Sequence, residues 1–375
     1  MTENKRKKIL IPYASYGSGH KTVAKGIADH FNKNEEYEVL CIDILKYLNP
    51  YFEKLTVTLY EKLCFRIPFF MELMYQSTDF DNSASFHKLY NNKKFRKIVF
   101  DFNPDIVIST HFFTSRLIAD YVQNELITAK LITIVTDYKT HAQWLTKKRV
   151  EDAIVINTKA ERQELIKKGI PTKRIYTFGI PVSEKFYEIK NSKSLLIKKF
   201  NLDIEKPTIL FIAGGSAGLT SSLKYLKALL DMKKDVNILF ISGTNKKVYK
   251  KAGEYEKQYK NLKVFGFVTN MPEFFVVADL VITKPGGATV TECLHMNKPM
   301  LFISFSAGQE KENYRYVVKS GFGKKTSSTF FFKRTLNLLI ENPKHLQKMS
   351  KKISESHNIN AIKELENLVN KLINN

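Results

Sequence analysis

The 375 residues favour two domains over one, and a net charge of +23, from 60 Lys and Arg against 37 Asp and Glu, favours a polyanionic partner. No stretch holds the roughly 18 to 20 uninterrupted apolar residues of a membrane span, and the first apolar run is too short for a signal peptide. The three cysteines form no CxxC pair, so we expect reduced thiols in a cytoplasmic protein without a zinc cluster or a disulfide framework.

The basic residues are spread along the chain, with short clusters at residues 5–8, 147–149 and 351–352. No RNP-type motif, helix-turn-helix signal or zinc finger accompanies them, so we expect no nucleic-acid partner. An AT-rich genome, which inflates the use of Lys and Asn, accounts for part of the excess. The rest of the excess favours phosphorylated ligands or an anionic membrane surface. We expect the protein to lie peripherally on the inner face of the cell membrane.

Short β-branched runs alternate with longer helical patterns from the N-terminus onward. Strands are predicted at residues 7–14, 37–43, 104–109, 130–137, 153–157 and 174–179. Most of them are nearly continuous apolar runs, which is typical of parallel strands buried on both faces. Between the first two, Val23, Ile27 and Phe31 recur every four residues and predict a helix with one apolar face over residues 20–33.

Residues 47–90 interrupt this alternation, because they hold eleven Phe or Tyr and separate two strands by far more than a normal crossover. One interpretation is an α-helical insertion whose aromatic side chains pack inward. The other is an amphipathic surface that lies in a bilayer interface and admits a lipid, and both stay open. Asp79-Phe80-Asp81 matches a DxD metal motif of another fold, but it follows no clear strand, so we expect no metal site there.

The alternation begins again near residue 207, after a polar segment at 188–206 that we predict to be a linker. Strands follow at residues 207–214, 236–242, 262–268, 279–284 and 299–304, and residues 346–375 have helical spacing. We therefore predict an α/β protein with two Rossmann-like doubly wound domains, 1–187 and 207–345, which face a central cleft.

The sequence SYGSGH, residues 15–20, joins the first predicted strand to the first helix. Ligands of doubly wound domains bind at such turns, beyond the carboxyl ends of the strands. Gly17 and Gly19 allow the backbone to approach a ligand, and His20 has an ordinary pKa suited to proton abstraction near neutral pH. Residue 22 is Thr22 where a dinucleotide fingerprint requires a third glycine. A capped helix start with an incidental histidine is the alternative.

Gly-rich turns also follow strands of the second domain. Gly286 and Gly287 precede a predicted helix whose free N–H groups would bind an anion. Glu292, one turn further on, is suited to accept hydrogen bonds from the paired hydroxyls of a ribose. The turn around Ser216 offers N–H groups and a hydroxyl to phosphate oxygens. These turns predict a site for a nucleotide-sugar.

Polar side chains follow two other strands. Gln309, Glu310 and Asn313 come after the strand at 299–304 and are suited to hydrogen bond hexose hydroxyls. Asp137 and His141 come after a strand of the first domain. Because the carboxyl ends of parallel strands share one edge of a sheet, we expect all of these turns to line the cleft.

These motifs together resemble glycosyltransferase family 28. The resemblance rests on GSGH, TDYxxHxxW, FGIPV at 178–182, the segment 262–323 and GQEKEN, and it runs from about residue 7 to 325. Within the family, the motifs are most similar to those of processive diacylglycerol β-glucosyltransferases and monogalactosyldiacylglycerol synthases. The resemblance implies a GT-B fold and an inverting transfer from a UDP-hexose, with glucose favoured over galactose, to the 3-hydroxyl of 1,2-diacylglycerol. The product would be a membrane glycolipid, made in one step or in several.

The resemblance also implies roles for single residues. His20 would be the general base at the acceptor hydroxyl or its orienter, and Asp137 would act on His20 or on the acceptor. The donor contacts would be Phe265, Phe267 and Val268 on uracil, Ser216, Gly286 and Gly287 on the diphosphate, Glu292 on ribose, and Gln309 with Glu310 on hexose. No cofactor or metal is expected, since N–H groups and helix dipoles would stabilise the departing UDP.

Two departures from the family pattern leave the donor sugar open. The second-domain turn reads AGGSAG, which is closer to the lipid II-forming N-acetylglucosaminyl transferases, and the first turn lacks the common triple glycine. N-acetylglucosaminyl transfer to a polyprenyl-linked acceptor therefore stays an alternative. So do a non-catalytic basic protein that binds membrane or nucleic acid, and a nucleotide-sugar epimerase of the same fold. The oligomeric state is not predicted.

Overall fold

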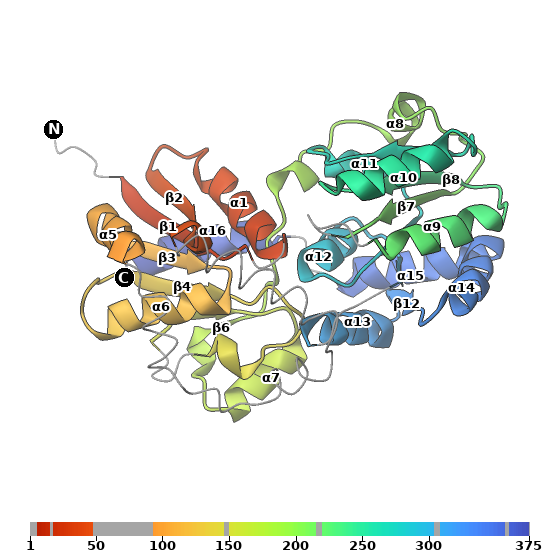
Figure 1. Cartoon of the computed structure of the whole chain (residues 1–375). Coiled ribbons are helices and arrows are strands. Elements are labelled where there is room, and N and C mark those ends of the chain that lie inside the picture. The colour runs from red at the N-terminus through yellow and green to blue at the C-terminus, as the bar shows by residue number, and fades with distance from the viewer. Residues whose placement is uncertain are drawn as a thin grey trace. The chain divides into compact units, whose positions relative to one another are not determined.

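The computed structural model describes residues 6–15, 18–47, 93–145, 150–214, 220–303, 308–356 and 360–374. The chain forms two compact α/β units (Figure 1). Unit 1 comprises Met1–Glu184, Ser306–Gln309 and Asn360–Asn375, and unit 2 comprises Lys185–Phe305 and Glu310–Ile359. Gly17, Ser216, the Asp79-Phe80-Asp81 motif and nearly all of the aromatic segment 47–90 lie outside the described residues.

Unit 1 is built on a six-stranded parallel sheet with the order β2-β1-β3-β4-β5-β6. The strands are β1 (Lys7–Tyr13), β2 (Tyr37–Asp43), β3 (Ile106–Ser109), β4 (Lys130–Ile134), β5 (Ala153–Val155) and β6 (Ile175–Tyr176). Every strand predicted in the first half is therefore confirmed. The strand order reverses between β1 and β3, and a doubly wound sheet binds ligands at such a switch point.

The helices of unit 1 follow the predicted alternation. They are α1 (Gly19–Phe31), α5 (Lys93–Phe102), α6 (Phe112–Gln123), α7 (Lys159–Lys167) and α16 (Ala361–Ile373), with the short 3-10 turns η1 (Ile44–Tyr47), η2 (Ala142–Trp144) and η3 (Thr172–Arg174). Another 3-10 turn, η4 (Glu184–Phe186), lies where the chain leaves unit 1. Val23, Ile27 and Phe31 are buried, as the four-residue spacing predicts.

The last helix of the chain, α16, completes unit 1 and packs against α1. The Nε2 atom of His30, on α1, lies 3.2 Å from Oε2 of Glu366, and its Nδ1 atom lies 2.5 Å from Oε1 of Glu184. The hydroxyl of Tyr37 donates a hydrogen bond to Asn370. These polar contacts flank an apolar face of α16 that is almost fully buried, namely Ile362, Leu365, Leu368 and Val369.

Unit 2 is built on a second six-stranded parallel sheet, with the order β12-β11-β10-β7-β8-β9. The strands are β7 (Thr208–Ile212), β8 (Asn237–Ile241), β9 (Leu262–Phe265), β10 (Leu280–Thr283), β11 (Met300–Phe302) and β12 (Gly323–Lys325). The first five confirm the prediction. The edge strand β12 was not predicted, because Lys324 and Lys325 are exposed and give it no apolar run. Here the order reverses between β7 and β10.

The helices of unit 2 are α8 (Lys193–Lys199), α9 (Ser222–Asp231), α10 (Lys246–Glu256), α11 (Met271–Val277), α12 (Gly287–His295), α13 (Gln309–Ser320), α14 (Thr329–Glu341) and α15 (Pro343–Ser356). Helix α8 lies inside the segment that we expected to be a linker. Leu196 is fully buried there, and the ring of Phe200 lies 4.6 Å from that of Phe274, centroid to centroid. This part of the segment is therefore packed onto unit 2.

Each unit has its own apolar core. In unit 1 the core lies between the sheet and α5 and α6, and in unit 2 it lies between the sheet and α9, α10 and α14. Cys41 and Cys293 are free thiols. None of the described helices combines the length and the apolar composition that crossing a membrane requires.

Candidate functional site

The turn after β1 places His20 in the first turn of α1, beside the switch point of unit 1. The Nδ1 atom of His20 lies 2.8 Å from the backbone carbonyl oxygen of Thr110, which follows β3, and 2.8 Å from Oγ1 of Thr136, which follows β4. A carbonyl oxygen can only accept a hydrogen bond, so Nδ1 carries the proton and donates it. The neutral ring therefore keeps a lone pair on Nε2, and no described residue hydrogen bonds to that atom.

The environment of His20 favours its neutral form. The residue is partly exposed, but protein atoms surround the ring closely enough for burial to lower its pKa to about 4, against the opposing effect of the Thr110 hydrogen bond. Nε2 is consequently unprotonated at neutral pH, and at this pKa the ring is a weaker base than the ordinary histidine that the sequence predicts. Because Nδ1 is held by residues that follow two neighbouring strands, the sheet fixes the direction of the Nε2 lone pair.

Aromatic rings close one side of this histidine. The ring of His111 meets that of His20 edge-on, with centroids 4.5 Å apart, and stacks on Phe112 at the same centroid distance. The Nδ1 atom of His111 accepts a hydrogen bond of 3.1 Å from the backbone N–H of Phe113 and so caps α6. Trp144 lies 6.5 Å from His20 between centroids, and no described residue accepts a hydrogen bond from its buried indole nitrogen. Burial lowers the pKa of His111 well below its usual value, so this wall is uncharged.

A buried network holds the loop after β4. The side-chain amide of Asn157 donates to the backbone oxygens of Asp137, at 2.7 Å, and Val135, at 3.1 Å. The carboxyl group of Glu161, on α7, accepts from the backbone N–H of Asn157 at 3.2 Å and from the hydroxyl of Thr140 at 3.1 Å. Burial raises the pKa of Glu161 to about 7. The network fixes the loop that carries Thr136, and with it one contact of His20.

Asp137 and His141 lie on this loop, and both are almost fully buried. Burial lowers the pKa of His141 to about 3, so its ring is neutral. Among the described residues, Asp137 makes no hydrogen bond to His20, whose orientation comes from Thr110 and Thr136. A contact of Asp137 or His141 with an acceptor stays a prediction.

In unit 2, α12 begins at Gly287, the last residue of the Pro-Gly-Gly turn that follows β10. Gly286 is the N-cap residue, and its carbonyl oxygen accepts a hydrogen bond of 2.9 Å from Val290 N–H. The N–H groups of residues 287–289 therefore point out of the helix N-terminus, as at any uncapped helix start. A Cβ at Gly286 would meet nothing within 4 Å. This end of α12, with Gly287 as its first residue, is suited to bind an anion at the switch point of unit 2.

Lys284, which precedes this turn, is a cation that the sequence motifs did not single out. Its Nζ atom lies 2.6 Å from Oε1 of Glu310, in the first turn of α13. Gly214, after β7, has a φ of +88°, and a Cβ there would lie 3.0 Å from Cδ of Lys284. The amide of Asn313 is fully buried and donates to the carbonyl oxygen of Pro285 at 3.0 Å. Asn313 thus holds the turn, while its predicted contact with a hexose is untested.

The loop after β9 separates a packed aromatic residue from an exposed one. The carbonyl oxygen of Phe265 accepts hydrogen bonds from the N–H and the hydroxyl of Ser242, at 2.9 and 3.1 Å. Its ring lies 4.9 Å from that of Phe274 between centroids. Phe267 is 71% exposed, and Val268 is half-buried. Phe265 therefore anchors the loop, and the ring of Phe267 lies exposed on it. Contacts of Phe265, Phe267 and Val268 with uracil stay predictions.

Two predicted donor contacts lie on helices that start at this edge of the sheet. Glu292 is partly exposed in the second turn of α12, and burial raises the pKa of its carboxyl group to about 8. Gln309 is the first residue of α13. Where the structure describes side chains, no group of three or more His, Cys, Asp or Glu is placed to hold a metal ion.

Family models match both halves of the chain. Residues 20–182 match the model of monogalactosyldiacylglycerol (MGDG) synthase, and residues 209–371 match the model of the glycosyltransferase family 28 C-terminal domain. The chain is a glycosyltransferase of family 28. This is a family of UDP-sugar-dependent hexosyltransferases, so the enzyme class predicted from the motifs is confirmed.

Curated relatives resemble this glycosyltransferase along nearly its whole length. The processive diacylglycerol beta-glucosyltransferase of Staphylococcus epidermidis is 28% identical over 95% of this chain and 90% of its own. The enzyme of that name from Staphylococcus saprophyticus is 26% identical over 99% of this chain and 94% of its own.

Solved structures confirm the GT-B fold of the glycosyltransferase. MurG of Acinetobacter baumannii superposes with a TM-score of 0.60 at 15% identity, covering 97% of this chain and 99% of its own. The Staphylococcus aureus MnaA-UDP co-structure superposes with a TM-score of 0.63 at 13% identity, covering 98% and 97%. At these identities the likeness concerns the fold alone.

The glycosyltransferase holds its histidine with residues to which the sequence analysis assigned no role. Thr110 and His111 directly follow β3, the neighbour of β1, and Thr136 lies one residue before Asp137. The sequence signal for the first two was a polar pair, Thr110-His111, at the end of a predicted strand. It stayed ambiguous because the strand order, which places β3 beside β1, cannot be read from the pattern of apolar runs.

Proposed function

We propose that this glycosyltransferase transfers a hexose, glucose in preference to galactose, from a UDP-sugar to the 3-hydroxyl of 1,2-diacylglycerol, giving a β-glycosyldiacylglycerol. Relatives that carry the name processive diacylglycerol beta-glucosyltransferase match the chain nearly end to end, which supports this acceptor. The match of residues 20–182 to the monogalactosyldiacylglycerol synthase model adds support, since that range contains His20.

One observation carries the reaction: His20 donates through Nδ1 to the Thr110 carbonyl and keeps Nε2 as a base. In the proposed step the acceptor oxygen bonds to the anomeric carbon, and its hydroxyl proton passes to Nε2. The bond from the anomeric carbon to the diphosphate oxygen breaks, and its electron pair leaves with UDP. Attack from the face opposite UDP inverts the anomeric centre. A positioned base of this kind contributes about 10²- to 10⁴-fold to the rate.

The donor would lie on unit 2. The N–H groups at the start of α12, at Gly286 and Gly287, would bind the diphosphate and stabilise the charge that develops on the departing UDP. Lys284 adds a positive charge beside that turn and holds Glu310 in place for the sugar. The remaining predicted contacts are Phe265, Phe267 and Val268 on uracil, Ser216 on the diphosphate, Glu292 on ribose, and Gln309 with Glu310 on the hexose.

The acceptor would be drawn from a membrane. Diacylglycerol lies within a bilayer, and the net charge of +23 favours peripheral binding to anionic lipid. We infer that the enzyme acts at the inner face of the cell membrane and reaches the lipid there.

The deciding experiment offers diacylglycerol in liposomes with UDP-glucose, UDP-galactose and UDP-N-acetylglucosamine in separate reactions, and resolves the lipid products by mass. A hexosyldiacylglycerol with UDP-glucose is expected, and longer products would reveal repeated transfer. If no donor gives a glycosyldiacylglycerol, while UDP-N-acetylglucosamine labels an added polyprenyl-linked acceptor, the proposed acceptor is wrong. His20→Ala should lower the yield of product by about 10²- to 10⁴-fold in either case.

A further inference from the structure

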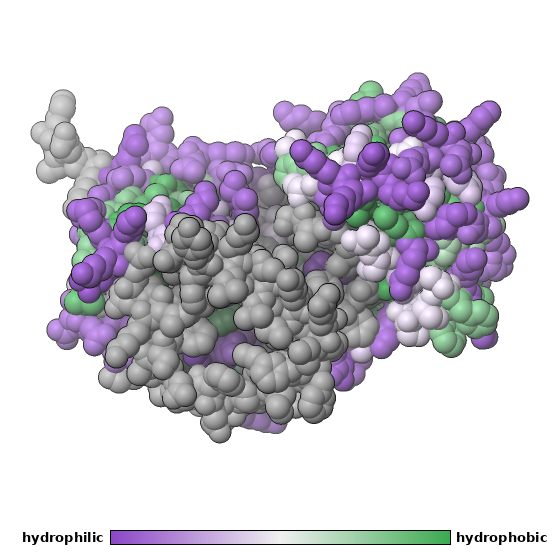
Figure 2. Space-filling model, in the orientation of Figure 1, coloured by the Kyte–Doolittle hydropathy of each residue, from purple (hydrophilic) through white to green (hydrophobic). Residues whose placement is uncertain are grey.

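The outward face of α14 carries large apolar side chains in contact with water. Phe330 is 69% exposed, Phe331 is 50% exposed and Leu338 is 55% exposed. The opposite face of the helix is buried in the core of unit 2 through Phe332, Leu336 and Leu339. Figure 2 shows hydrophobic side chains gathered on the surface around α14. The exposed side chains are therefore additional to those that α14 needs for packing.

The spacing along α14 combines these apolar groups with cations. Phe330, Arg334 and Leu338 are four residues apart, so they form one stripe along the helix. The rings of Phe330 and Phe331 lie edge-on to each other, with centroids 5.4 Å apart. Lys333 and Arg334 are both exposed. We name these five residues, Phe330, Phe331, Lys333, Arg334 and Leu338, the α14 face.

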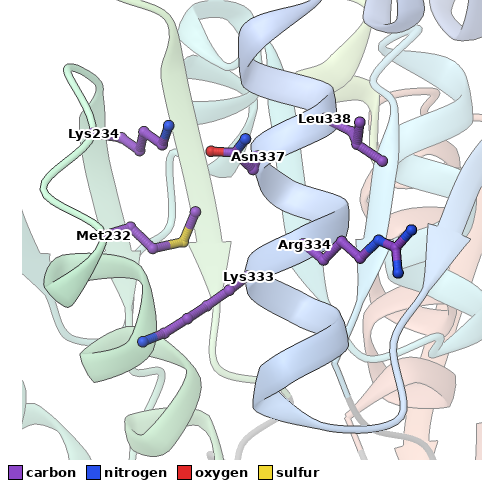
Figure 3. A pocket seen from close by; sticks show the side chains of 6 residues that line it. All are labelled: Met232, Lys234, Lys333, Arg334, Asn337 and Leu338. Carbon is purple, nitrogen blue, oxygen red and sulfur yellow. The ribbon is translucent and has the colours of Figure 1, made fainter.

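A hollow lined partly by basic residues borders the α14 face. A hollow of about 470 Å³ beside the helix is lined by Met232, Lys234, Lys333, Arg334, Asn337 and Leu338. In Figure 3, Lys333 extends toward the end of α9, while Arg334 and Leu338 lie on the other side of α14. Glu341 is the one acid of α14, at its far end, and Lys234 pairs with it at 2.8 Å. Because Lys234 neutralises that acid, Lys333 and Arg334 give the α14 face its positive charge.

The topology places the start of α14 at the ligand-binding edge of unit 2. Strand β12 is parallel to β11, and β11 is parallel to β10, so their carboxyl ends share one edge. Gly286 follows β10 at that edge, and α14 begins four residues after β12 ends at Lys325. The Phe330–Phe331 pair lies in the first turn of α14. It is therefore near the edge of the sheet where Gly286 follows β10.

We infer that the α14 face binds an anionic lipid bilayer. Aromatic rings enter the interface of a bilayer, and Lys and Arg beside them are attracted to acidic headgroups, which is the combination found here. A nucleic acid would match the cations but not the exposed Phe and Leu side chains. A second copy of the chain would place like charges opposite each other. The choice of a bilayer as the binding partner rests on the proposed function, because the proposed acceptor is a membrane lipid.

The test is vesicle flotation of the full chain with phosphatidylglycerol-containing vesicles that lack diacylglycerol, without a UDP-sugar. Phe330→Ser with Phe331→Ser should weaken binding about tenfold, because two interfacial rings are lost. The matched control is Leu195→Ser with Ile204→Ser, two side chains that are 53% and 65% exposed elsewhere on unit 2. The control should float like the unaltered protein.

A second pair of variants tests the charges. Lys333→Glu with Arg334→Glu should weaken binding to anionic vesicles about tenfold or more and reduce its salt dependence. The control, Lys246→Glu with Lys247→Glu, makes the same change in net charge at two exposed positions of α10. If the two charge variants lose binding equally, net charge alone explains it and the α14 face is not the site.

The inference is overturned if Phe330→Ser with Phe331→Ser floats like the unaltered protein. It is also overturned if that variant keeps vesicle binding but changes the mass of the particle in light scattering, since the face would then join two copies. The vesicles contain neither substrate, so the result is independent of catalysis. If vesicle binding depends on the α14 face but no donor gives a glycosyldiacylglycerol, the proposed function is refuted and this inference still holds.

Discussion

The backbone carbonyl oxygen of Thr110 lies 2.8 Å from Nδ1 of His20, at the point where the strand order of unit 1 reverses. Many catalytic histidines are oriented by a carboxylate, which raises the basicity of the ring. A neutral carbonyl orients the ring without adding a negative charge, so burial can lower the pKa of His20 to about 4. The ring then stays unprotonated throughout the physiological pH range.

His20→Ala should lower turnover by about 10²- to 10⁴-fold and leave UDP binding nearly unchanged, because the proposed base is lost while the donor contacts lie on unit 2. Steady-state kinetics and calorimetric titration with UDP measure the two quantities. His345→Ala, at an exposed histidine of α15, is the control and should behave like the unaltered enzyme. Unchanged turnover in His20→Ala would remove the residue from the mechanism.

Thr136→Val should lower kcat by about two- to tenfold, since Nδ1 loses one of its two partners and one hydrogen bond contributes about 0.5–1.5 kcal/mol. Thr133→Val is the matched control. Thr133 is a buried threonine of β4 whose hydroxyl donates to Ser115 at 3.0 Å. Both variants should lose similar stability, and only the first should lose turnover. An equal loss of turnover in both would mean that the effect is structural.

Glu292 should make donor binding dependent on pH. Burial raises the pKa of this carboxyl group to about 8, so it is mostly protonated at pH 7 and mostly ionised at pH 8.5. An ionised carboxylate accepts hydrogen bonds from both ribose hydroxyls, so KM for the UDP-sugar should fall about fivefold or more over this interval. Glu292→Gln should show a higher KM that does not vary with pH. If KM for the UDP-sugar still falls between pH 7 and pH 8.5 in Glu292→Gln, the titrating group is not Glu292.

Glu161 should make stability fall as pH rises. Its folded pKa is raised to about 7 from an ordinary value of 4.5, so the folded state binds more protons than the unfolded state between these values. This contribution to stability is present below pH 4.5 and is lost progressively up to about pH 7. Glu161→Gln removes the titration. The Tm of the variant minus that of the unaltered enzyme should therefore be more positive at pH 8 than at pH 5. An equal difference at both pH values would contradict the assignment.

Gly323→Ala should destabilise unit 2 by about 1–3 kcal/mol, because a Cβ there would lie 2.5 Å from the carbonyl oxygen of Met300 and force the edge strand β12 away. Gly253→Ala, in α10, is a control of opposite sign. Its Cβ would meet no atom within 4 Å, so it should stabilise the helix by about 0.5–1 kcal/mol. Thermal unfolding measures both, and equal midpoints would contradict the packing of β12.

The strands and the loops after them could be predicted, because each is marked by residues that are adjacent in the sequence. Continuous apolar runs located the strands of both sheets, and the three-residue β12 was missed because two of its residues, Lys324 and Lys325, are exposed at a sheet edge. The loops that carry His20 and Gly286 were found because glycines and a histidine directly follow apolar runs.

The contacts of these residues could not be predicted, because they depend on which strands are neighbours. Thr110 is 90 residues from His20 in the chain, and Thr136 is 116 residues away. The pairing of Lys284 with Glu310 depends in the same way on the order of β10 and β11. The exposed stripe of α14 was hidden for another reason, since a run of three Phe residues does not reveal which of them faces the core.

The return of α16 to unit 1 bears on how the protein is made. A ribosome releases residues 1–184 long before it makes Glu366 and Asn370, which hold His30 and Tyr37. Until then the apolar surface that receives Leu365 and Val369 has no cover, so the N-terminal half of the enzyme can reach its final form only after the residues of α16 have been made. A fragment that stops at Glu184 should therefore aggregate, and supplying residues 360–375 as a separate peptide should rescue it.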